Sequence, residues 1–598
     1  MRLYLALLVC AVGFAQDSGN APATPPEQKQ TVIVTGVYAP VPLDEADRDV
    51  NVIPLDTARK LLSNTLLDYL RLDSSVDVQA RAPNGVSDDI SIRGGSYGQT
   101  LVLLDGIRLD DAQSGHFDAD IPIPPDAAGR IEILKGAGSA IYGSDAVGGA
   151  INVITSQPES SELHLRAAGG NFGVNQESGS LDTVWRNAAE SLSFSRDFST
   201  GFTEDRDYRN LSLSSLTNLK TRLGATEVLL VYNDRPFGAA NFYGSPDAWE
   251  RTRTWFAALR QELGKNTEAS FAFRRHSDLY VLFRNDPAFY TNHHYEEGYQ
   301  AALRRHHQLK KTLTVSYGGE AFRDELDSSN LGIHQRNYGA VYAAVDMRAL
   351  SRYSFTIGAR EEIFHGGARQ FNPTAAAGAW LSPHWKVRAS ASRAFRLPNY
   401  TELYYLDPFN AGNPNLKPEI AWSYDGGLEW NAGERVRGDF GVFANRERNV
   451  VDFVQGSDGI YRAMNIYNLN FTGADASVKF RAAKTQWVEL RYTAIHGAQA
   501  ALDGFVSRYI FNYPVDNGTA SWEAALPWGL IARSRVGALL RFDRDPYALW
   551  DMYLADRRGH WSPFVQLTNL TSTQYQEILG VAMPGRAVVA GLDYRLGW

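Results

Sequence analysis

A glycine-flanked serine is the first feature of the sequence that could do chemistry. Gly94-Gly95-Ser96-Tyr97-Gly98 has the G-x-S-x-G spacing with which α/β-hydrolases present a catalytic serine on a turn between a strand and a helix. Here Leu101-Val102-Leu103-Leu104 follows, and this short apolar run is strand-like rather than helical. We therefore expect a hairpin turn at this position and not a nucleophile.

Other patterns that are typical of enzymes are incomplete. Gly136-Ala137-Gly138 begins like a dinucleotide-binding loop, but Ile141 stands where that loop needs a third small residue. Gly264-Lys265-Asn266 lacks the Ser or Thr of a nucleotide-binding P-loop. His293-His294 and His306-His307 are poorly placed to share a metal ion, because neighbouring strand residues point to opposite faces. We predict no catalytic residue, so energy for an active process has to come from a partner.

An acidic cluster is the best candidate for a metal site. Glu204, Asp205 and Asp207 supply carboxylate oxygens, which calcium prefers as a hard cation. Arg206 lies inside the cluster and would repel a cation. A solvated charged loop is therefore the favoured interpretation, and calcium binding is the alternative.

The N-terminal segments predict an exported chain. Residues 1–15 have the pattern of a secretory signal peptide, because Arg2 precedes an apolar run too short to span a membrane as a helix. The only cysteine, Cys10, lies in this run, so the mature chain can form no disulfide. Residues 16–29 are polar and rich in proline, which predicts a flexible linker. The β-prone heptapeptide Gln30-Thr31-Val32-Ile33-Val34-Thr35-Gly36 follows, either as the first strand of the next domain or as a free strand that pairs with a partner's sheet edge.

The overall composition excludes two classes of protein. Formal net charge is -8, the pI is about 5.9 and Lys and Arg do not cluster, which argues against nucleic-acid binding. After the N-terminal apolar run, no apolar stretch reaches the roughly 18 residues that a membrane helix needs. The chain is nevertheless 12% aromatic and contains 52 glycines, at a mean hydropathy of -0.30. Many short, half-exposed strands would explain this composition.

Residues 37–156 are predicted to form a small α+β domain. The leucines between Leu61 and Leu72 have helical spacing. Glycines mark tight turns between short apolar runs that predict strands. These runs are Ile90–Arg93, Leu101–Leu104, Ile131–Leu134 and Ile151–Ile154.

Residues 157–598 are predicted to form a transmembrane all-β barrel. Apolar and polar residues alternate along many segments; near the C-terminus, Val588 and Leu592 share one face and Asp593 lies on the other. Aromatic residues near the ends of the apolar faces, and charges on the second face, favour a lipid-exposed barrel with a wet lumen over a soluble sandwich. At about 20 residues for each strand and its connection, this length gives about 22 antiparallel strands, the size of plugged outer-membrane transporters.

Several of these segments resemble the TonB-dependent receptor family. Gln30–Gly36 resembles its TonB box. The segments that look like its plug domain are Ile92-Arg93-Gly94, Val102–Arg108, Arg130-Ile131-Glu132-Ile133-Leu134-Lys135-Gly136 and Ala140–Thr155. Asn413–Glu419 resembles a barrel motif, and the aromatic C-terminal residue Trp598 is typical of barrels inserted into outer membranes. The resemblance covers the whole chain after the signal peptide, strongly to Thr155 and more diffusely beyond it.

The resemblance implies a plug inside a 22-stranded barrel in the outer membrane of a Gram-negative bacterium. It implies active import of a scarce small-molecule ligand, with energy delivered by TonB and the ExbB–ExbD motor of the inner membrane. The barrel is expected to be a monomer in the lipid bilayer, a transporter and not an enzyme, with no cofactor apart from the calcium considered above. A passive porin or adhesin barrel is the distant alternative. Such a barrel would need neither a plug nor a TonB box, whereas this sequence has segments that resemble both.

Within the family, the short chain, its heptapeptide and Tyr142-Gly143-Ser144-Asp145-Ala146-Val147-Gly148-Gly149 most resemble the BtuB-like cobalamin receptors. The plug loops 82–88 and 110–117 carry neutral hydrogen-bonding groups, acids and an aromatic ring, but no Arg or Lys. Such groups fit an amide-rich corrinoid, whereas an anionic ferric siderophore, the alternative ligand, would favour cations. We therefore expect cobalamin or a related corrinoid. The residues predicted to contact it are Asn84, Ser87, Asp88, Gln113, Ser114, His116, Phe117, Tyr243 and Tyr405.

Overall fold

The computed structural model describes residues 32–55, 65–349, 352–433, 435–466, 468–499 and 506–598. The predicted signal peptide and linker lie outside these residues, as do Gln30 and Thr31 of the heptapeptide. Residues 56–64, which include the beginning of the helix expected from Leu61, also lie outside them.

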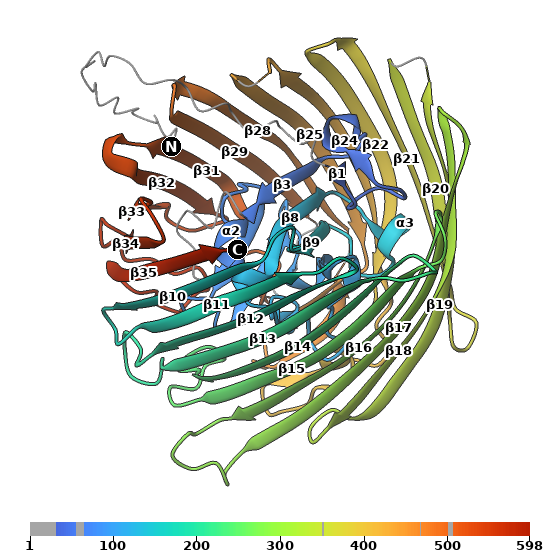
Figure 1. Cartoon of the computed structure of the whole chain (residues 1–598). Coiled ribbons are helices and arrows are strands. Elements are labelled where there is room, and N and C mark those ends of the chain that lie inside the picture. Colours follow the sequence, from blue (N-terminus) through green and yellow to red (C-terminus); the bar gives the residue numbers. More distant parts are fainter. Residues whose placement is uncertain (1–31, 56–64, 350–351, 434, 467, 500–505) are drawn as a thin grey trace.

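In the described part of the chain, 22 antiparallel strands close into one barrel (Figure 1). The barrel strands follow one another in sequence order, and the last strand, β35, pairs with the first, β10, with Glu162 opposite Gly597. The predicted membrane barrel and its strand number are confirmed. The strands are β10 (Glu162–Gly170), β11 (Asn175–Val184), β12 (Ala188–Ser199), β13 (Tyr208–Lys220), β14 (Ala225–Gly238), β15 (Trp249–Glu262), β16 (Thr267–Val281), β17 (Thr291–Lys310), β18 (Leu313–Ser328), β19 (Gly332–Ala349), β20 (Tyr353–Phe364), β21 (Arg369–Ser382), β22 (Trp385–Arg396), β24 (Glu419–Asn431), β25 (Val436–Arg448), β28 (Leu469–Ala483), β29 (Gln486–Gln499), β31 (Pro514–Ala525), β32 (Leu530–Arg541), β33 (Tyr547–Asp556), β34 (Trp561–Thr568) and β35 (Ala587–Gly597).

The barrel carries its apolar side chains on the outside. Along β12, Leu192 and Phe194 are 46% and 39% exposed, whereas Ser193 between them is 5% exposed and faces the lumen. Trp385 and Trp430 stack on neighbouring strands with ring centroids 5.7 Å apart. An apolar exterior with aromatic residues around a polar interior is the pattern that lipid stabilises.

The N-terminal domain lies inside the barrel as an α+β plug (Figure 1). Its five-stranded sheet has the order β3-β8-β9-β6-β7, and β4 and β5 form a separate hairpin. Ile131, Ile151 and Val153 of the sheet are fully buried in one apolar core with Leu70. The plug elements are β1 (Val32–Ile33), β2 (Val41–Pro42), β3 (Val50–Pro54), α2 (Leu66–Leu70), β4 (Val76–Ala80), β5 (Asp88–Ile92), β6 (Thr100–Leu104), β7 (Ile107–Arg108), β8 (Ala128–Lys135), α3 (Ser139–Tyr142) and β9 (Gly149–Thr155).

The described part of the expected helix, α2, ends earlier than the leucine spacing predicts. Thr65 caps its N-terminus, since the Thr65 side chain accepts from Asp68 N and the Asp68 side chain accepts from Thr65 N. The chain turns at once after Leu70, because Leu72 N donates to Tyr69 O in a tight turn. Among the described residues, no helix is both long and apolar enough to cross a membrane.

The long connections of the barrel gather at one end, opposite the short turns such as 185–187. They include 239–248, 282–290 and 397–418, which contain the turn-rich segments of the sequence. Connection 397–418 carries α4 (Tyr400–Tyr404) and β23 (Asn410–Ala411). β23 joins a four-stranded sheet outside the barrel with β27 (Tyr461–Ile466), β26 (Val450–Gln455) and β30 (Val506–Ser507).

Candidate functional site

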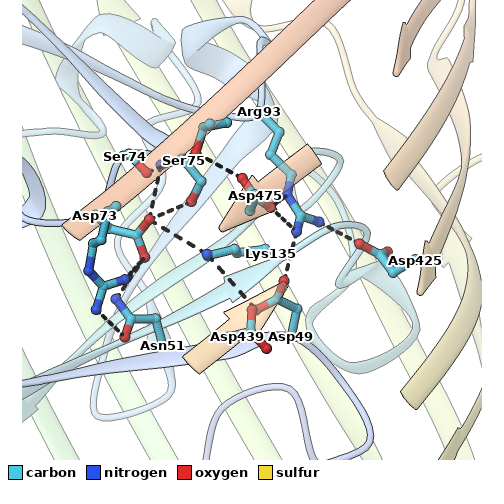
Figure 2. A network of polar contacts seen from close by, with 12 residues as sticks. Asp49, Asn51, Asp73, Ser74, Ser75, Arg93, Lys135, Asp425, Asp439 and Asp475 are labelled. Carbon is cyan, nitrogen blue, oxygen red and sulfur yellow. Dashed lines mark hydrogen bonds and ion pairs between the residues drawn. The ribbon is translucent and has the colours of Figure 1, made fainter. Parts of the chain in front are cut away.

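Arg93 joins the plug to two strands of the barrel (Figure 2). It follows β5 with a left-handed φ of 52°. Its guanidinium pairs with Asp49 of the plug at 2.7 Å and with Asp425 and Asp475 of β24 and β28. All four side chains are almost fully buried, so three carboxylates converge on one cation that water does not reach.

Lys135 is the second cation of this network, with its Nζ 3.6 Å from Asp73 Oδ1 and 4.0 Å from Asp49 Oδ1 (Figure 2). Burial alone would raise the pKa of Asp73, but Lys135 and Arg491 outweigh burial and lower it to about 2. Burial would likewise raise the pKa of Asp49, yet Arg388 and Lys135 hold it well below its usual range. Both carboxylates therefore remain ionised and attach the plug to the barrel wall.

The heptapeptide is held against the plug at its described end. Val32 and Ile33 form β1, which pairs with β2. One carboxylate oxygen of Glu132, on β8, accepts from Val34 N at 3.0 Å and from Thr35 N at 2.8 Å.

Two further side chains bind the end of the heptapeptide. Gly36 N donates to the Tyr142 hydroxyl at 3.1 Å, and Asn152 Nδ2 donates to Thr35 Oγ1 at 2.9 Å. The segment is thus tied to the plug by a few hydrogen bonds, which individually contribute only about 0.5–1.5 kcal/mol, and by the fully buried side chain of Ile33.

The predicted plug loop 110–117 lies under the long connections. His116 stacks on Tyr97 with ring centroids 4.0 Å apart, and Tyr509 meets both rings edge-on at 5.3 and 5.4 Å. His116 Nδ1 lies 2.7 Å from Asp89 Oδ1. Burial lowers the pKa of His116 although Asp89 opposes this effect. The result is a partly exposed aromatic surface at the top of the plug.

Arginine residues surround this surface, although the predicted loops contain none. Arg81 Nη2 lies 2.9 Å from Asp89 Oδ2, and its guanidinium carbon is 5.5 Å from the centre of the Tyr243 ring. Arg508 stacks over Tyr509 at 5.4 Å. The top of the plug, which we call the apex, therefore carries more positively charged groups than the sequences of loops 82–88 and 110–117 predict.

Gln113 and Ser114 are buried and bind neighbouring parts of the protein. Gln113 Nε2 donates to Asp278 of β16 at 3.3 Å, while its Oε1 has no hydrogen-bond partner in the described chain. Ser114 Oγ accepts from His116 N at 3.4 Å. Tyr400 N and Thr401 N of the α4 connection donate to Ala112 O and Gln113 O at 2.8 and 2.9 Å.

The other predicted ligand residues lie at different places around the apex. Phe117 packs on His276 of β16, with ring centroids 4.8 Å apart. Ser87 and Tyr243 share a side-chain hydrogen bond.

Three predicted residues lie away from the aromatic surface. Asn84 donates to the Tyr208 hydroxyl at the barrel wall. Asp88 is buried at the same side of the plug. Tyr405 bonds Tyr290 and Asp407 within the long connections. The predicted ligand residues that lie near the apex are therefore Ser87, Gln113, Ser114, His116, Phe117 and Tyr243.

The acidic cluster predicted as a calcium alternative is already paired with a cation. Arg284 Nη1 lies 3.0 Å from Asp205 Oδ1 and 2.5 Å from Asp207 Oδ1. Glu204 is exposed, and Arg206 is buried with its Nη1 donating to Arg81 O at 2.7 Å. In the described ranges, no group of three or more His, Cys, Asp or Glu side chains is arranged for a metal ion. The pairing of Asp205 and Asp207 with Arg284 favours the interpretation as a charged loop, which stays a prediction.

Some structural roles of residues near the site were predicted from the sequence, and others were not. Ser96 of the G-x-S-x-G pattern caps a 3-10 turn, Tyr97–Gln99, and β6 follows, as expected for a turn and not for a nucleophile elbow. Tyr97 itself forms part of the apex. Glu132 and Arg93 lie in quoted plug motifs, but Glu132 binds Thr35, 97 positions away, and the carboxylates that bind Arg93 are 44, 332 and 382 positions away, so they give no local signal.

Comparisons with known proteins agree with this architecture. A family model described as "TonB dependent receptor-like, beta-barrel" matches residues 159–570, and one described as "TonB-dependent Receptor Plug Domain" matches residues 42–150. The vitamin B12 transporter BtuB of Photobacterium profundum is 27% identical over 418 residues, which cover 64% of this chain and 67% of that protein. The iron-regulated outer membrane virulence protein of Vibrio cholerae is 25% identical over 599 residues, 88% of this chain and 85% of that protein.

Solved structures share the fold. The siderophore receptor PirA of Pseudomonas aeruginosa superposes with a TM-score of 0.73 over 92% of this chain and 99% of that chain, at 18% identity. The match of the barrel model spans well over half of the sequence, and the plug model matches the domain in its lumen. The chain therefore belongs to the TonB-dependent receptors, plugged outer-membrane barrels that transport small molecules.

Proposed function

We propose that this receptor imports cobalamin or a related corrinoid, and that Gln30–Gly36 is the TonB box on which TonB and the ExbB–ExbD motor pull. Coupling to TonB is supported by the hydrogen bonds that Val34 N and Thr35 N donate to the Glu132 carboxylate, because they attach the heptapeptide directly to the plug. Val32 and Val34 are 45% and 38% exposed, whereas Ile33 and Thr35 are fully buried, so this β-prone segment has to leave the plug before a partner strand can pair with it. The calcium alternative plays no part in the proposal.

The ligand proposal rests on the chemistry of the apex. His116, Tyr97 and Tyr509 offer ring faces and edges. Arg81 is already paired with Asp89 and adds little free positive charge. A large ligand with many amides and little net charge fits such a surface, and the B12 transporters among the relatives support this assignment.

A ferric siderophore is the second candidate. Arg508 lies beside Tyr509 at the apex, and a guanidinium there would attract an anionic ligand. The iron-regulated relative from Vibrio cholerae also favours this candidate. The passive porin or adhesin has no such support, because the plug occupies the lumen (Figure 1).

Growth of a host that lacks its own cobalamin and siderophore receptors tests the ligand. We expect the chain to restore growth on limiting cobalamin and not on limiting iron with ferric enterobactin or another siderophore. Labelled cobalamin should bind the cells with an affinity that changes little with salt, because few ligand charges are screened. Growth on iron alone, with salt-sensitive siderophore binding, would reject the corrinoid. Monomeric migration after mild detergent extraction would support the expected monomer.

A further inference from the structure

Three arginines of β13 and β15 share one carboxylate on β14. Arg251 binds Asp234 through two nitrogens, with Nε–Oδ1 and Nη2–Oδ2 distances of 2.7 and 3.0 Å. Arg209 Nη2 lies 2.9 Å from Asp234 Oδ2, and Arg253 Nε lies 3.2 Å from Asp234 Oδ1. In the described chain, Asp234 is the only carboxylate with which these arginines form ion pairs. The four residues, which we call the arginine cluster, therefore have a surplus of two positive charges.

The arginine cluster lies on the outer face of the barrel. Arg235, the residue after Asp234, points inward and pairs with Asp120 of the plug. Thr252, which lies between two of the arginines, also points inward and donates to Asp120 at 2.9 Å. Because successive strand residues point to opposite faces, the cluster faces the surroundings of the barrel. Two of the arginine side chains are 45% and 43% exposed, and Asp234 is covered by them.

The cluster lies at the height where a barrel leaves the hydrocarbon region of a membrane. Asp234 is nine positions from Ala225, which begins β14 at the end with the short turns. At about 3.4 Å per residue and a strand tilt of about 40°, this separation is about 23 Å along the barrel axis. The apolar band of membrane barrels is about 25 Å tall. The arginines therefore reach the headgroup region on the side of the long connections.

An apolar groove of about 870 Å³ lies below the cluster on the outer face of β10–β16. Tyr232 and Trp255 line its upper end, and each is two positions from a cluster residue on the same strand. The groove exists because small and large outward-facing side chains alternate across neighbouring strands. Leu230, for example, pairs with Ser215 on one side and with Ala257 on the other. A charged cluster thus stands directly above a hollow with apolar walls.

Neighbouring carboxylates do not cancel the surplus charge of the cluster. Glu177 on β11 pairs with Arg196 at 2.9 Å, and Glu297 on β17 pairs with Arg275 at 3.6 Å. The surplus also makes a second copy of the chain a poor occupant of the groove. A two-fold contact uses the same patch of both copies, so it would bring like charges together.

We propose that the arginine cluster and the groove form one binding site for a lipid that carries phosphate groups and several acyl chains. Arg209 and Arg253 each use one nitrogen for Asp234, so their other guanidinium nitrogens are available to phosphate oxygens. Guanidinium groups match phosphate geometry with short, charge-assisted hydrogen bonds. The acyl chains of the same molecule lie in the groove. A lipid without phosphate fits the groove but leaves the surplus charge without a partner.

Binding of lipid A, a phosphorylated lipid with several acyl chains, to the purified full chain in non-ionic detergent tests the site. Native mass spectrometry counts the lipid molecules that each chain retains as the lipid concentration rises. Arg209→Gln with Arg253→Gln removes the surplus charge and leaves Arg251 on Asp234. Arg305→Gln with Arg323→Gln is the control, because it removes two exposed arginines from β17 and β18. Gel mobility of the unheated protein confirms that each variant is folded.

We expect the unchanged chain to retain one molecule of lipid A. The Arg209→Gln, Arg253→Gln variant should bind lipid A at least tenfold more weakly than the control, because the bonds to phosphate are lost. Ala257→Phe fills the groove without changing the charge and should weaken binding several-fold, whereas Ala375→Phe, at an exposed position of β21, should not. Dephosphorylated lipid A should bind the unchanged chain at least tenfold more weakly than lipid A, which tests the phosphate without any substitution.

Four results would each overturn the proposal. The first is equal retention of lipid A by the cluster variant and its control, and the second is equal binding of lipid A and its dephosphorylated form. Complete displacement of lipid A by millimolar inorganic phosphate would show that the cluster binds a free anion and not a lipid. A dimer that Ala257→Phe separates would assign the groove to a second copy of the chain.

Discussion

Arg93 shows how one plug residue can decide whether the plug stays in place. Its guanidinium is the shared partner of Asp49, Asp425 and Asp475, all buried. A buried ion pair contributes little net stability compared with apolar packing, but removal of one partner leaves charges without compensation. The cost of losing this single cation therefore exceeds the value of any one of its bonds.

Arg93→Ala is expected to destabilise the plug by about 3–5 kcal/mol, because it leaves three carboxylates facing one another. When both proteins are digested with trypsin at increasing urea, the plug of Arg93→Ala should be cut at a lower urea concentration than the plug of the unchanged chain. Arg196→Ala is the control, since the Arg196–Glu177 pair on the barrel is over a third exposed and should contribute little. Equal digestion of the two variants would show that the network does not hold the plug.

Asp88 gives the plug a dependence on pH. Burial raises its pKa to about 8, while Arg71 opposes the effect and Glu577 adds to it. The folded plug therefore favours the protonated carboxyl, a contribution that is complete below the ordinary pKa of about 4 and is lost as the pH rises towards 8.

Asp88→Asn should reduce the loss of plug stability between pH 5 and pH 8, as measured by the urea midpoint of plug digestion. The amide cannot ionise, so the penalty for a buried charge at pH 8 disappears. Asp458→Asn is the control, because the bond from Arg462 lowers the pKa of this exposed residue to about 2, outside the range tested. A pH dependence that is the same in both variants would contradict this role of Asp88.

Substitution of Gln113 tests whether the ligand binds at the apex. If its unpartnered Oε1 binds the ligand, Gln113→Ala should weaken cobalamin binding by about tenfold to a hundredfold, the effect of 1–3 kcal/mol for an unpaired buried group. Gln455→Ala changes the same side chain in β26 of the external sheet and should leave binding unaltered. Labelled cobalamin titrated on whole cells gives both constants. An unchanged constant for Gln113→Ala would remove this residue from the site.

At the scale of elements, periodicity was the most reliable guide. Alternation predicts that Val588 and Leu592 face lipid, and they are 39% exposed while Asp593 is 7% exposed. The limits of α2 could not be predicted, because the turn that ends it depends on Tyr69 O and on packing against the sheet. The docking of the heptapeptide could not be predicted either, since Glu132 and Asn152 are brought to it only by the fold.

The substitution Val34→Pro tests whether the heptapeptide acts as a strand that pairs with TonB. Proline removes the N–H that bonds Glu132 and prevents pairing with a partner strand. Surface binding of ligand should persist, because the apex lies at the other end of the plug, while TonB-driven uptake is lost. Val34→Thr keeps the donor and the β propensity and should transport normally. Normal uptake by Val34→Pro would make the segment an ordinary structural strand.

At the scale of the whole molecule, strand number follows from length, but the match between plug and barrel does not. About 20 residues per strand gives 22 strands, as observed. The cavities beside α2 depend on side chains from the two ends of the barrel sequence, such as Arg166 and Arg533. No local pattern relates such residues, so their position around shared cavities is visible only in the folded chain.

The closed barrel predicts unusual resistance to denaturants. The pairing of β10 with β35 closes the barrel formed by the described strands, so no strand edge is left from which unfolding can begin. The unheated protein should therefore run faster than the heated protein on a gel containing dodecyl sulfate. Arg93→Ala should keep this mobility shift even though its plug is digested, because the barrel strands do not need that ion network to stay paired. Loss of the shift in Arg93→Ala would mean that plug and barrel form one cooperative unit, whereas a soluble product without detergent would contradict the barrel itself.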